Sequence, residues 1–176
     1  MSLRGGEGIT HLHYTGTQLW KFGFGLSYSS FEVIVEAEPQ PTDAVSGWTV
    51  ESFAAAAKQA VYSVRVTNVG SVGGGFNVPG FVTSDQAEGF PLQRLFGFVG
   101  VDWLEPGASR VLELALPTAK QLSVADEHGQ QWLQAADYTV HIGAPPGGSD
   151  DPTAASAAVS VLQIRGDAPL AVSRPL

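Results

Sequence analysis

Two adjacent pairs of acidic residues are the first candidates for chemistry, because paired carboxyl groups can act as acid and base in a hydrolytic reaction. The pairs are Asp126-Glu127 and Asp150-Asp151. Both lie in segments whose composition predicts exposed turns, where water keeps each carboxylate ionised and unable to donate a proton near neutral pH. The sequence therefore assigns no catalytic residue to the chain.

Histidine, glycine and serine residues give no stronger signal of a site. His11 and His13 would lie on one side of an extended segment, as two metal ligands would, but no third ligand is close to them in sequence. The glycine-rich run at residues 70–75 lacks the lysine and helix of a phosphate-binding loop, so it predicts a hairpin turn. No serine lies in a nucleophile elbow. The sequence predicts neither a metal site nor a cofactor.

Four tryptophans could either stack on sugar rings or fill a hydrophobic core. They are Trp20, Trp48, Trp103 and Trp132. Trp103 and Trp132 lie within or beside predicted strands, where large aromatic side chains usually fill the interior of a sandwich. We expect both in the core, with carbohydrate binding as the weaker alternative.

The composition narrows the fold class and disfavours several partners. The 176 residues include 21 glycines and 11 prolines, and only 15% are charged, which is typical of a turn-rich domain of short strands. The formal net charge of -8 would repel nucleic acids and anionic membranes. The sequence has no cysteine, no recognisable targeting signal and no long apolar segment, which leaves the cellular location open.

Alternation of apolar and polar residues predicts most of the strands. The predicted ranges are 31–37, 61–68, 95–104, 112–116, 138–142 and 155–164. Pro79 puts a further strand at 76–82 in doubt, because proline cannot donate to a strand ladder. Residues 48–60 contain an alanine-rich run that predicts a helix of one or two turns. The segment before Tyr138 predicts a tyrosine corner, which would serve the fold.

An aromatic and glycine-rich stretch at residues 19–31 precedes the first strand. Its large side chains at positions 22, 24, 26 and 28 would share one face of an extended chain, and small residues would occupy the other. After Ser29-Ser30 the large apolar residues shift from even-numbered to odd-numbered positions. This shift predicts a bulge or bend at the junction. A sandwich that begins near Phe31 cannot bury all of this aromatic surface.

Several short motifs follow one another along the chain in a specific order. They are Tyr14-Thr15-Gly16, residues 22–28 (FGFGLSY) with Phe31, residues 66–70 (VTNVG), residues 95–98 (LFGF), residues 104–109 (LEPGAS), Leu122-Ser123, Asp126 with Gly129, and residues 137–140 (DYTV) with Gly143. This succession resembles the connector and C-terminal fibronectin type III-like domain of glycoside hydrolase family 3 enzymes, the β-glucosidases and β-xylosidases. The resemblance spans Tyr14 to Gly143.

The resemblance implies an all-β, immunoglobulin/fibronectin type III-like sandwich of about seven strands. It divides the chain into an extended connector arm at residues 1–29, a sandwich at residues 30–167 and a loose tail at residues 168–176. Residues 38–60 do not match the family pattern, so we interpret them as an inserted loop or short helix within the sandwich.

The resemblance also implies a function. The chain would be a non-catalytic module of an enzyme that hydrolyses terminal β-glucosides or β-xylosides without a cofactor, since no segment matches the catalytic domains of the family. A secreted location follows if the chain behaves as the family does. The residues expected to dock on the catalytic domains are Trp20, Phe22, Phe24, Leu26 and Tyr28. Left exposed, they would favour weak self-association. The alternative is an independent β-sandwich that binds carbohydrate or protein.

Overall fold

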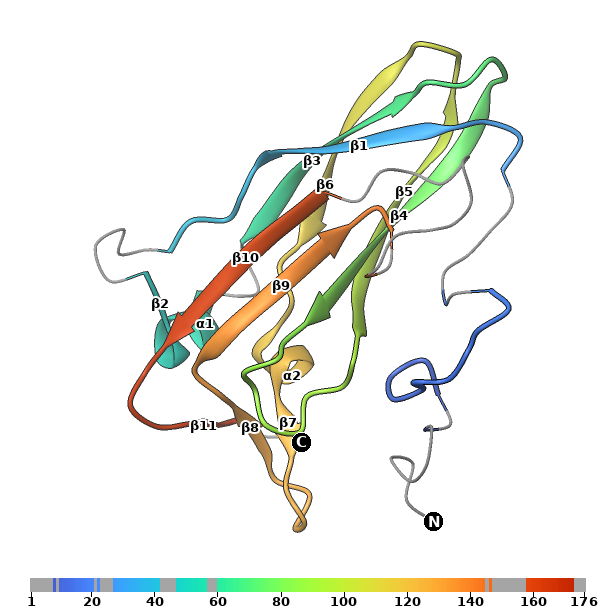
Figure 1. The fold of residues 1–176 in the computed structure, drawn as a ribbon. Coiled ribbons are helices and arrows are strands. Elements are labelled where there is room, and N and C mark those ends of the chain that lie inside the picture. Colours follow the sequence, from blue (N-terminus) through green and yellow to red (C-terminus); the bar gives the residue numbers. More distant parts are fainter. Residues whose placement is uncertain are drawn as a thin grey trace.

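The computed structural model describes Gly8, residues 10–20, Phe22, and residues 27–41, 47–56, 60–144, 146 and 158–172. Two packed β-sheets make up most of the molecule (Figure 1). One has the order β1-β3-β6, with β1 at Phe31–Ala37, β3 at Val61–Asn68 and β6 at Ser109–Ala115. The other has the order β2-β10-β9-β4-β5, with β2 at Trp48–Thr49, β10 at Ala158–Arg165, β9 at Ala136–Ile142, β4 at Gly74–Thr83 and β5 at Arg94–Leu104. The predicted all-β sandwich is confirmed.

The hydrophobic core lies between these two sheets. On β3, Tyr62, Val64 and Val66 are buried and alternate with more exposed residues, as their spacing predicts. The same alternation buries Tyr138, Val140 and Ile142 on β9. Tyr138 forms the predicted tyrosine corner, because its hydroxyl donates to the carbonyl oxygen of Gln134 at 3.0 Å. Burial raises the pKa of Tyr138 to about 12.

The segment that departs from the family pattern is part of this core. A helix, α1 at Val50–Ala56, follows β2 directly and confirms the predicted short helix. The hydroxyl of Thr49 accepts a hydrogen bond from the Ser52 backbone N–H at 3.1 Å, which caps the first turn. Phe53 is fully buried and meets Trp48 edge to face, with ring centroids 5.7 Å apart. Trp48 and Phe53 thus contribute to the hydrophobic core, so this segment does more than connect β1 to β3.

Pro79 lies inside β4 without breaking it. The Pro79 carbonyl accepts a hydrogen bond from Gly143 at 2.9 Å, so this edge of the residue faces β9. The pairing of β4 with β9 begins only at Gly80, opposite Ile142. In an antiparallel strand the N–H and C=O of one residue point to the same side, so the missing donor points past the end of β9. Proline therefore removes at most one bond, at the end of the β4–β9 pairing, and the strand left in doubt is present.

Buried Asn68 joins four segments at one end of the sandwich. Its amide nitrogen donates to the carbonyl oxygens of Val72 and Leu104 at 2.8 and 2.9 Å. Its amide oxygen accepts from the Ser29 hydroxyl at 2.6 Å and from the Gly70 backbone N–H at 3.0 Å. The bond to Ser29 holds the bend at Tyr28-Ser29 through which the chain enters β1, where the parity change predicts a bend.

A third, small sheet has the order β11-β8-β7. Its strands are β7 at Val124–Ala125, β8 at Gln131–Leu133 and β11 at Leu170–Val172. The prediction of a loose tail from residue 168 is wrong for β11, because Leu170 to Val172 pair with Leu133 to Gln131. Residues 173–176 lie outside the described part of the chain. A second helix, α2 at Ala119–Leu122, begins with a capping box between Thr118 and Gln121.

Both described helices, α1 and α2, are far too short to cross a membrane.

Candidate functional site

The N-terminal arm lies against the outer face of the larger sheet. Phe22 stacks on His11, with ring centroids 3.8 Å apart and an angle of 10° between the planes. The same phenylalanine meets Phe81 of β4 edge to face at 5.9 Å. Within the arm, His11 thus serves as a stacking partner of Phe22. The described residues contain no group of three or more side chains placed to hold a metal ion.

Two hydrogen bonds fasten the arm to the loop before β5. The Leu92 backbone N–H donates to the carbonyl oxygen of Leu12 at 2.9 Å. The Gln93 side-chain amide donates to the carbonyl oxygen of His11 at 3.2 Å. Together with Phe22, these bonds place the arm beside β4 and β5, at the right of the sandwich in Figure 1.

A row of four residues crosses the outer face of the larger sheet beneath the arm. Cross-strand pairing places Val159 opposite His141, His141 opposite Phe81, and Phe81 opposite Leu95. Phe81 is only 1% exposed although it faces away from the core, while Val159 and Leu95 at the ends of the row are exposed. Burial lowers the pKa of His141. The arm therefore covers the centre of this face and leaves its ends open.

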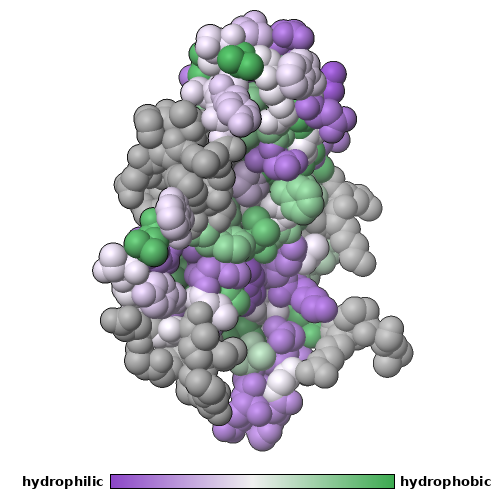
Figure 2. Space-filling model, turned by 90° about the vertical axis from the view of Figure 1, so that its right-hand side faces the viewer, coloured by the Kyte–Doolittle hydropathy of each residue, from purple (hydrophilic) through white to green (hydrophobic). Residues whose placement is uncertain are grey.

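The expected docking residues differ in their placement. Trp20 is 68% exposed and Tyr28 is 98% exposed, whereas Phe22 is 37% exposed and rests on Phe81. Phe24 and Leu26 lie outside the described residues. Figure 2 shows the side of the molecule on which the arm lies, with hydrophobic residues interspersed among hydrophilic ones. The expectation that the sandwich cannot bury all of the aromatic surface is confirmed for Trp20 and Tyr28.

The sequence reasoning missed Phe81, Leu92 and Gln93 as the residues that receive the arm. One signal was available, since Phe81 and Val82 are adjacent, large and apolar within a strand segment. Both are buried, so both faces of β4 must be covered at this point. The hydrogen bond from Gln93 to the His11 carbonyl has no comparable signature, because it depends on where the loop lies.

The tryptophans do not all follow the core prediction. Trp48 is in the core, but Trp103 is 57% exposed, so the prediction for Trp103 was wrong. A methyl group on Gly73 would come within 2.5 Å of the Trp103 ring, which shows that the ring lies across this glycine. The Trp103 indole N–H donates to the Glu105 carboxylate at 2.9 Å. Trp132 is partly exposed, lies outside the buried core and lines a groove, so the prediction was wrong for Trp132 as well.

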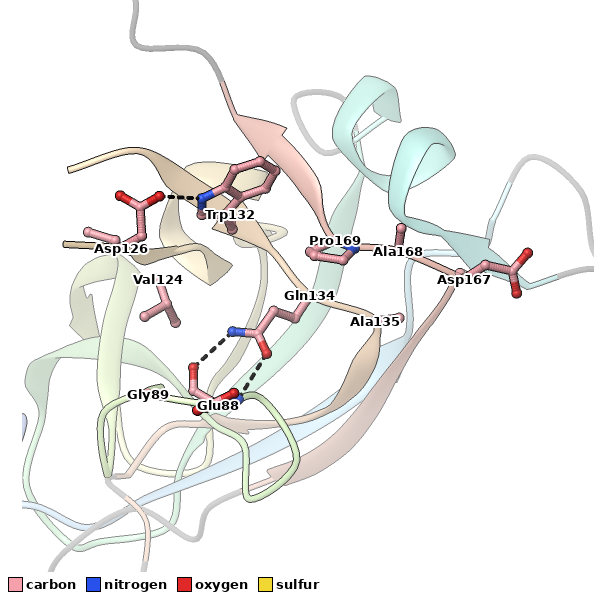
Figure 3. A pocket seen from close by; sticks show the side chains of 12 residues that line it. Glu88, Gly89, Val124, Asp126, Trp132, Gln134, Ala135, Asp167, Ala168 and Pro169 are labelled. Atoms are coloured by element: carbon pink, nitrogen blue, oxygen red, sulfur yellow. Dashed lines mark hydrogen bonds between the residues drawn. The ribbon is translucent and has the colours of Figure 1, made fainter. Parts of the chain in front are cut away.

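That groove lies at the end of the sandwich where the small third sheet is attached (Figure 3). It has a volume of about 730 Å³ and is open to solvent. Four stretches of chain line it: the loop between β4 and β5, the β7–β8 hairpin, the turn between β8 and β9, and the turn between β10 and β11. The lining residues are Glu88, Gly89, Val124, Ala125, Asp126, Trp132, Gln134, Ala135, Gly166, Asp167, Ala168 and Pro169.

Hydrogen bonds fix two walls of the groove. Asp126 accepts from the Trp132 indole N–H and from the backbone N–H groups of His128 and Gln130, each at 2.9 Å. Gln134 donates to the Glu88 carbonyl oxygen at 2.8 Å and accepts from the Glu88 backbone N–H at 2.9 Å.

The first acidic pair lies at this groove. The hydrogen bond from Trp132, followed by those from the two backbone groups, holds the pKa of Asp126 below its ordinary value. Glu127 is exposed, with a carboxylate oxygen 3.5 Å from His128 Nε2. A lowered pKa keeps Asp126 ionised, which is unsuited to a general acid. Asp150-Asp151 lies outside the described residues.

Comparisons with known proteins agree with this architecture. Residues 79–145 match the family model of the fibronectin type III-like domain. A probable exo-1,4-β-xylosidase of Aspergillus flavus is 31% identical over 162 residues, which cover 88% of this chain and 20% of the relative. A probable β-glucosidase of Emericella nidulans is 32% identical over 140 residues, covering 71% of this chain and 16% of the relative.

A solved structure supports the same fold. An exo-β-xylosidase of glycoside hydrolase family 3, in complex with a xylobiose aziridine probe, superposes with a TM-score of 0.71 at 23% identity. The match covers 97% of this chain and 22% of that structure. The chain spans about a fifth of the length of the curated relatives described above. It therefore carries a fibronectin type III-like domain of the type found in glycoside hydrolase family 3 β-xylosidases and β-glucosidases.

Proposed function

We propose that this chain is a non-catalytic C-terminal module of a family 3 glycoside hydrolase, and that it supports the catalytic domains by packing against them. The parent enzyme would hydrolyse terminal β-xylosides or β-glucosides, as the names of the relatives indicate for those proteins. The observation that carries the proposal is an arm that is tied to the sandwich at Leu12 and Phe22 yet exposes Trp20 and Tyr28.

The physical reason is the cost of exposing large aromatic side chains. Removing one from water is worth roughly 2 to 3 kcal/mol, so a partner surface that covers Trp20 and Tyr28 would gain stability from each. Leu19 is exposed beside Trp20 and would add to this contact. We assign the docking role to these residues together with Phe24 and Leu26 of the same arm.

The acidic residues support a non-catalytic role. A glycosidase places two carboxyl groups on either side of the bond that it cleaves, and one of them must be protonated to act as the acid. Hydrogen bonds lower the pKa of Asp126, and Arg165 lowers the pKa of Asp137. Purified chain should release no phenol above a buffer control from aryl β-xylosides or aryl β-glucosides. Turnover that disappears on substituting one of its own acidic residues would contradict this role.

A chimera tests the docking. The chain replaces the matching segment of the Aspergillus flavus relative, and melting temperatures are compared with and without Trp20→Ser and Tyr28→Ser. We expect a loss of several degrees in the chimera, from roughly 1 to 2 kcal/mol at each site. The isolated chain should lose less than the chimera does, because both side chains are largely exposed in it. Ile34→Ser on β1 is the matched control, and its effect should be the same in both proteins. Equal losses in the chimera and the isolated chain would contradict docking.

A further inference from the structure

The groove beside Trp132 has walls that are formed before any ligand arrives. The bond from Trp132 to Asp126 fixes the indole ring, and the two bonds between Gln134 and Glu88 fix the opposite wall (Figure 3). Pairing of Ala171 with Trp132 secures the turn between β10 and β11. A preformed site avoids the cost of ordering its side chains on binding.

The lining determines what kind of ligand the groove can accept. An indole ring, Val124, the alanines and Pro169 supply a nonpolar surface. The charged side chains of the lining are Glu88, Asp126 and Asp167, all acidic, and the lining includes no lysine, arginine or histidine. Carboxylates accept hydrogen bonds and do not donate them. The ligand must therefore present hydrogen-bond donors beside a nonpolar face, and an anionic ligand would be repelled.

Two of these carboxylates are available to a ligand. Asp126 is engaged by the β7–β8 hairpin, but the carboxylates of Glu88 and Asp167 make no hydrogen bond or ion pair within the described residues. Glu88 lies at the middle of the chain and Asp167 near its end; both line the groove, and the Asp167 side chain points away from Trp132 in Figure 3. The volume of about 730 Å³ lies within the usual range of ligand sites, and the open side leaves room for a polymer to extend.

We propose that this groove binds a short stretch of neutral glycan, with a pyranose ring against Trp132 and a hydroxyl group donating to Glu88. A sugar ring offers both surfaces that the lining requires: a face of C–H groups for the indole and a rim of hydroxyl donors for the carboxylates. The inference goes beyond the supporting role and does not rest on it, because the groove and the arm share no residue. Either can fail alone.

Nuclear magnetic resonance titration of the full chain tests this site. Xylohexaose and cellohexaose are added separately, and the Trp132 indole N–H is followed. We expect saturable shifts with a dissociation constant on the order of 1 mM. The shifts should be nearly the same at low and high salt, since a neutral ligand is not screened. No shift with either sugar at about ten times that concentration would overturn the proposal.

Substitutions locate the binding. Glu88→Gln with Asp167→Asn should weaken binding at least about fivefold, because charged acceptors are stronger than amides. This variant should stay folded, as neither carboxylate has a hydrogen-bond or ion-pair partner among the described residues. Trp132→Ala should abolish the shifts, but it also removes a bond to Asp126, so the double variant carries the test. Trp103→Ala, at an exposed tryptophan outside the groove, should leave the affinity unchanged. Shifts that survive the double substitution, or that require Trp103, would contradict the assignment.

A cationic probe distinguishes glycan binding from the main alternative, which is binding of a basic protein segment. Three carboxylates could also attract a lysine-rich segment, so tetralysine is titrated at low and high salt. We expect shifts at the groove to be weak and to vanish with salt. Tight, salt-sensitive tetralysine binding at Trp132 without any response to the sugars would assign the groove to a basic protein segment and overturn the glycan proposal.

Discussion

The two faces of the larger sheet are both buried in places, but different structures cover them. The inner face is covered by a whole second sheet, so Val78, Val82 and Val140 are each held by many neighbours. On the outer face, the Phe22 ring of the arm contacts Phe81 edge to face. Burial on the inner face thus depends on packing between the two sheets, whereas burial of Phe81 on the outer face involves contact with the arm. The stability of the two regions should differ accordingly.

Phe53→Ala should have the largest effect, because α1 contributes this ring to the interior. Truncating a fully buried phenylalanine typically lowers the free energy of unfolding by about 3 to 5 kcal/mol. Urea denaturation of the variant and the parent measures the difference. Val159→Ala on the outer face is the control and should cost less than about 1 kcal/mol. A small effect of Phe53→Ala would mean that the 38–60 segment is not part of the cooperative core.

Asn68→Ala should have the next largest effect. The substitution leaves the Leu104 carbonyl and the Ser29 hydroxyl without their buried partner. We expect a loss of about 2 to 3 kcal/mol, the usual cost of unsatisfied buried polar groups. Val69→Ala, next to it in sequence but exposed, should change the free energy of unfolding by less than about 0.5 kcal/mol. Similar values for both variants would show that the Asn68 network adds nothing to stability.

Phe22→Ala should have a moderate effect that is confined to the outer face. The ring is partly exposed, so we expect a loss of about 1 kcal/mol in the free energy of unfolding. Hydrogen exchange should increase around Phe81 and Leu92 and stay unchanged at Tyr62. Tyr28→Ala, in the same arm but almost fully exposed, should have no measurable effect. A loss as large as that of Phe53→Ala would remove the distinction between the two faces.

Asp137→Asn should have the smallest effect, and it should depend on pH. Hydrogen bonding to Arg165 lowers the pKa of Asp137 in the folded state. The stabilisation is therefore present above the unfolded value of about 3.9, and is lost as the pH falls through the lower folded value. Melting temperatures measured from about pH 6 to pH 2 should fall less steeply for Asp137→Asn than for the parent. Parallel profiles would contradict a contribution from this carboxylate.

The sequence predicted the inner face well because alternation reports burial on one side of a strand. The predicted range 31–37 coincides with β1, and the predicted range 61–68 with β3. Alternation could not predict the burial or pairing of residues that depend on a segment whose position the sequence does not indicate. Phe81 depends on the arm, and β11 depends on β8, which has three residues and little pattern of its own. Only the spatial arrangement brings Glu88, Trp132 and Asp167 to one groove, so no local motif could have predicted it.

The pairing of β4 with β5 contains two register shifts. These shifts affect how readily the sandwich can associate with other chains. β5 lies at the end of its sheet and pairs through β4 on one side, so alternate residues among its eleven direct their backbone groups to the other side. A flat edge of that length would template a strand from a second molecule. The shifts, at Gly74/Phe76 and Gly80/Phe81, divide β5 into segments of different twist. They let Phe96, Val101 and Leu104 all point inward despite their spacing, and they leave no continuous straight edge for edge-to-edge pairing.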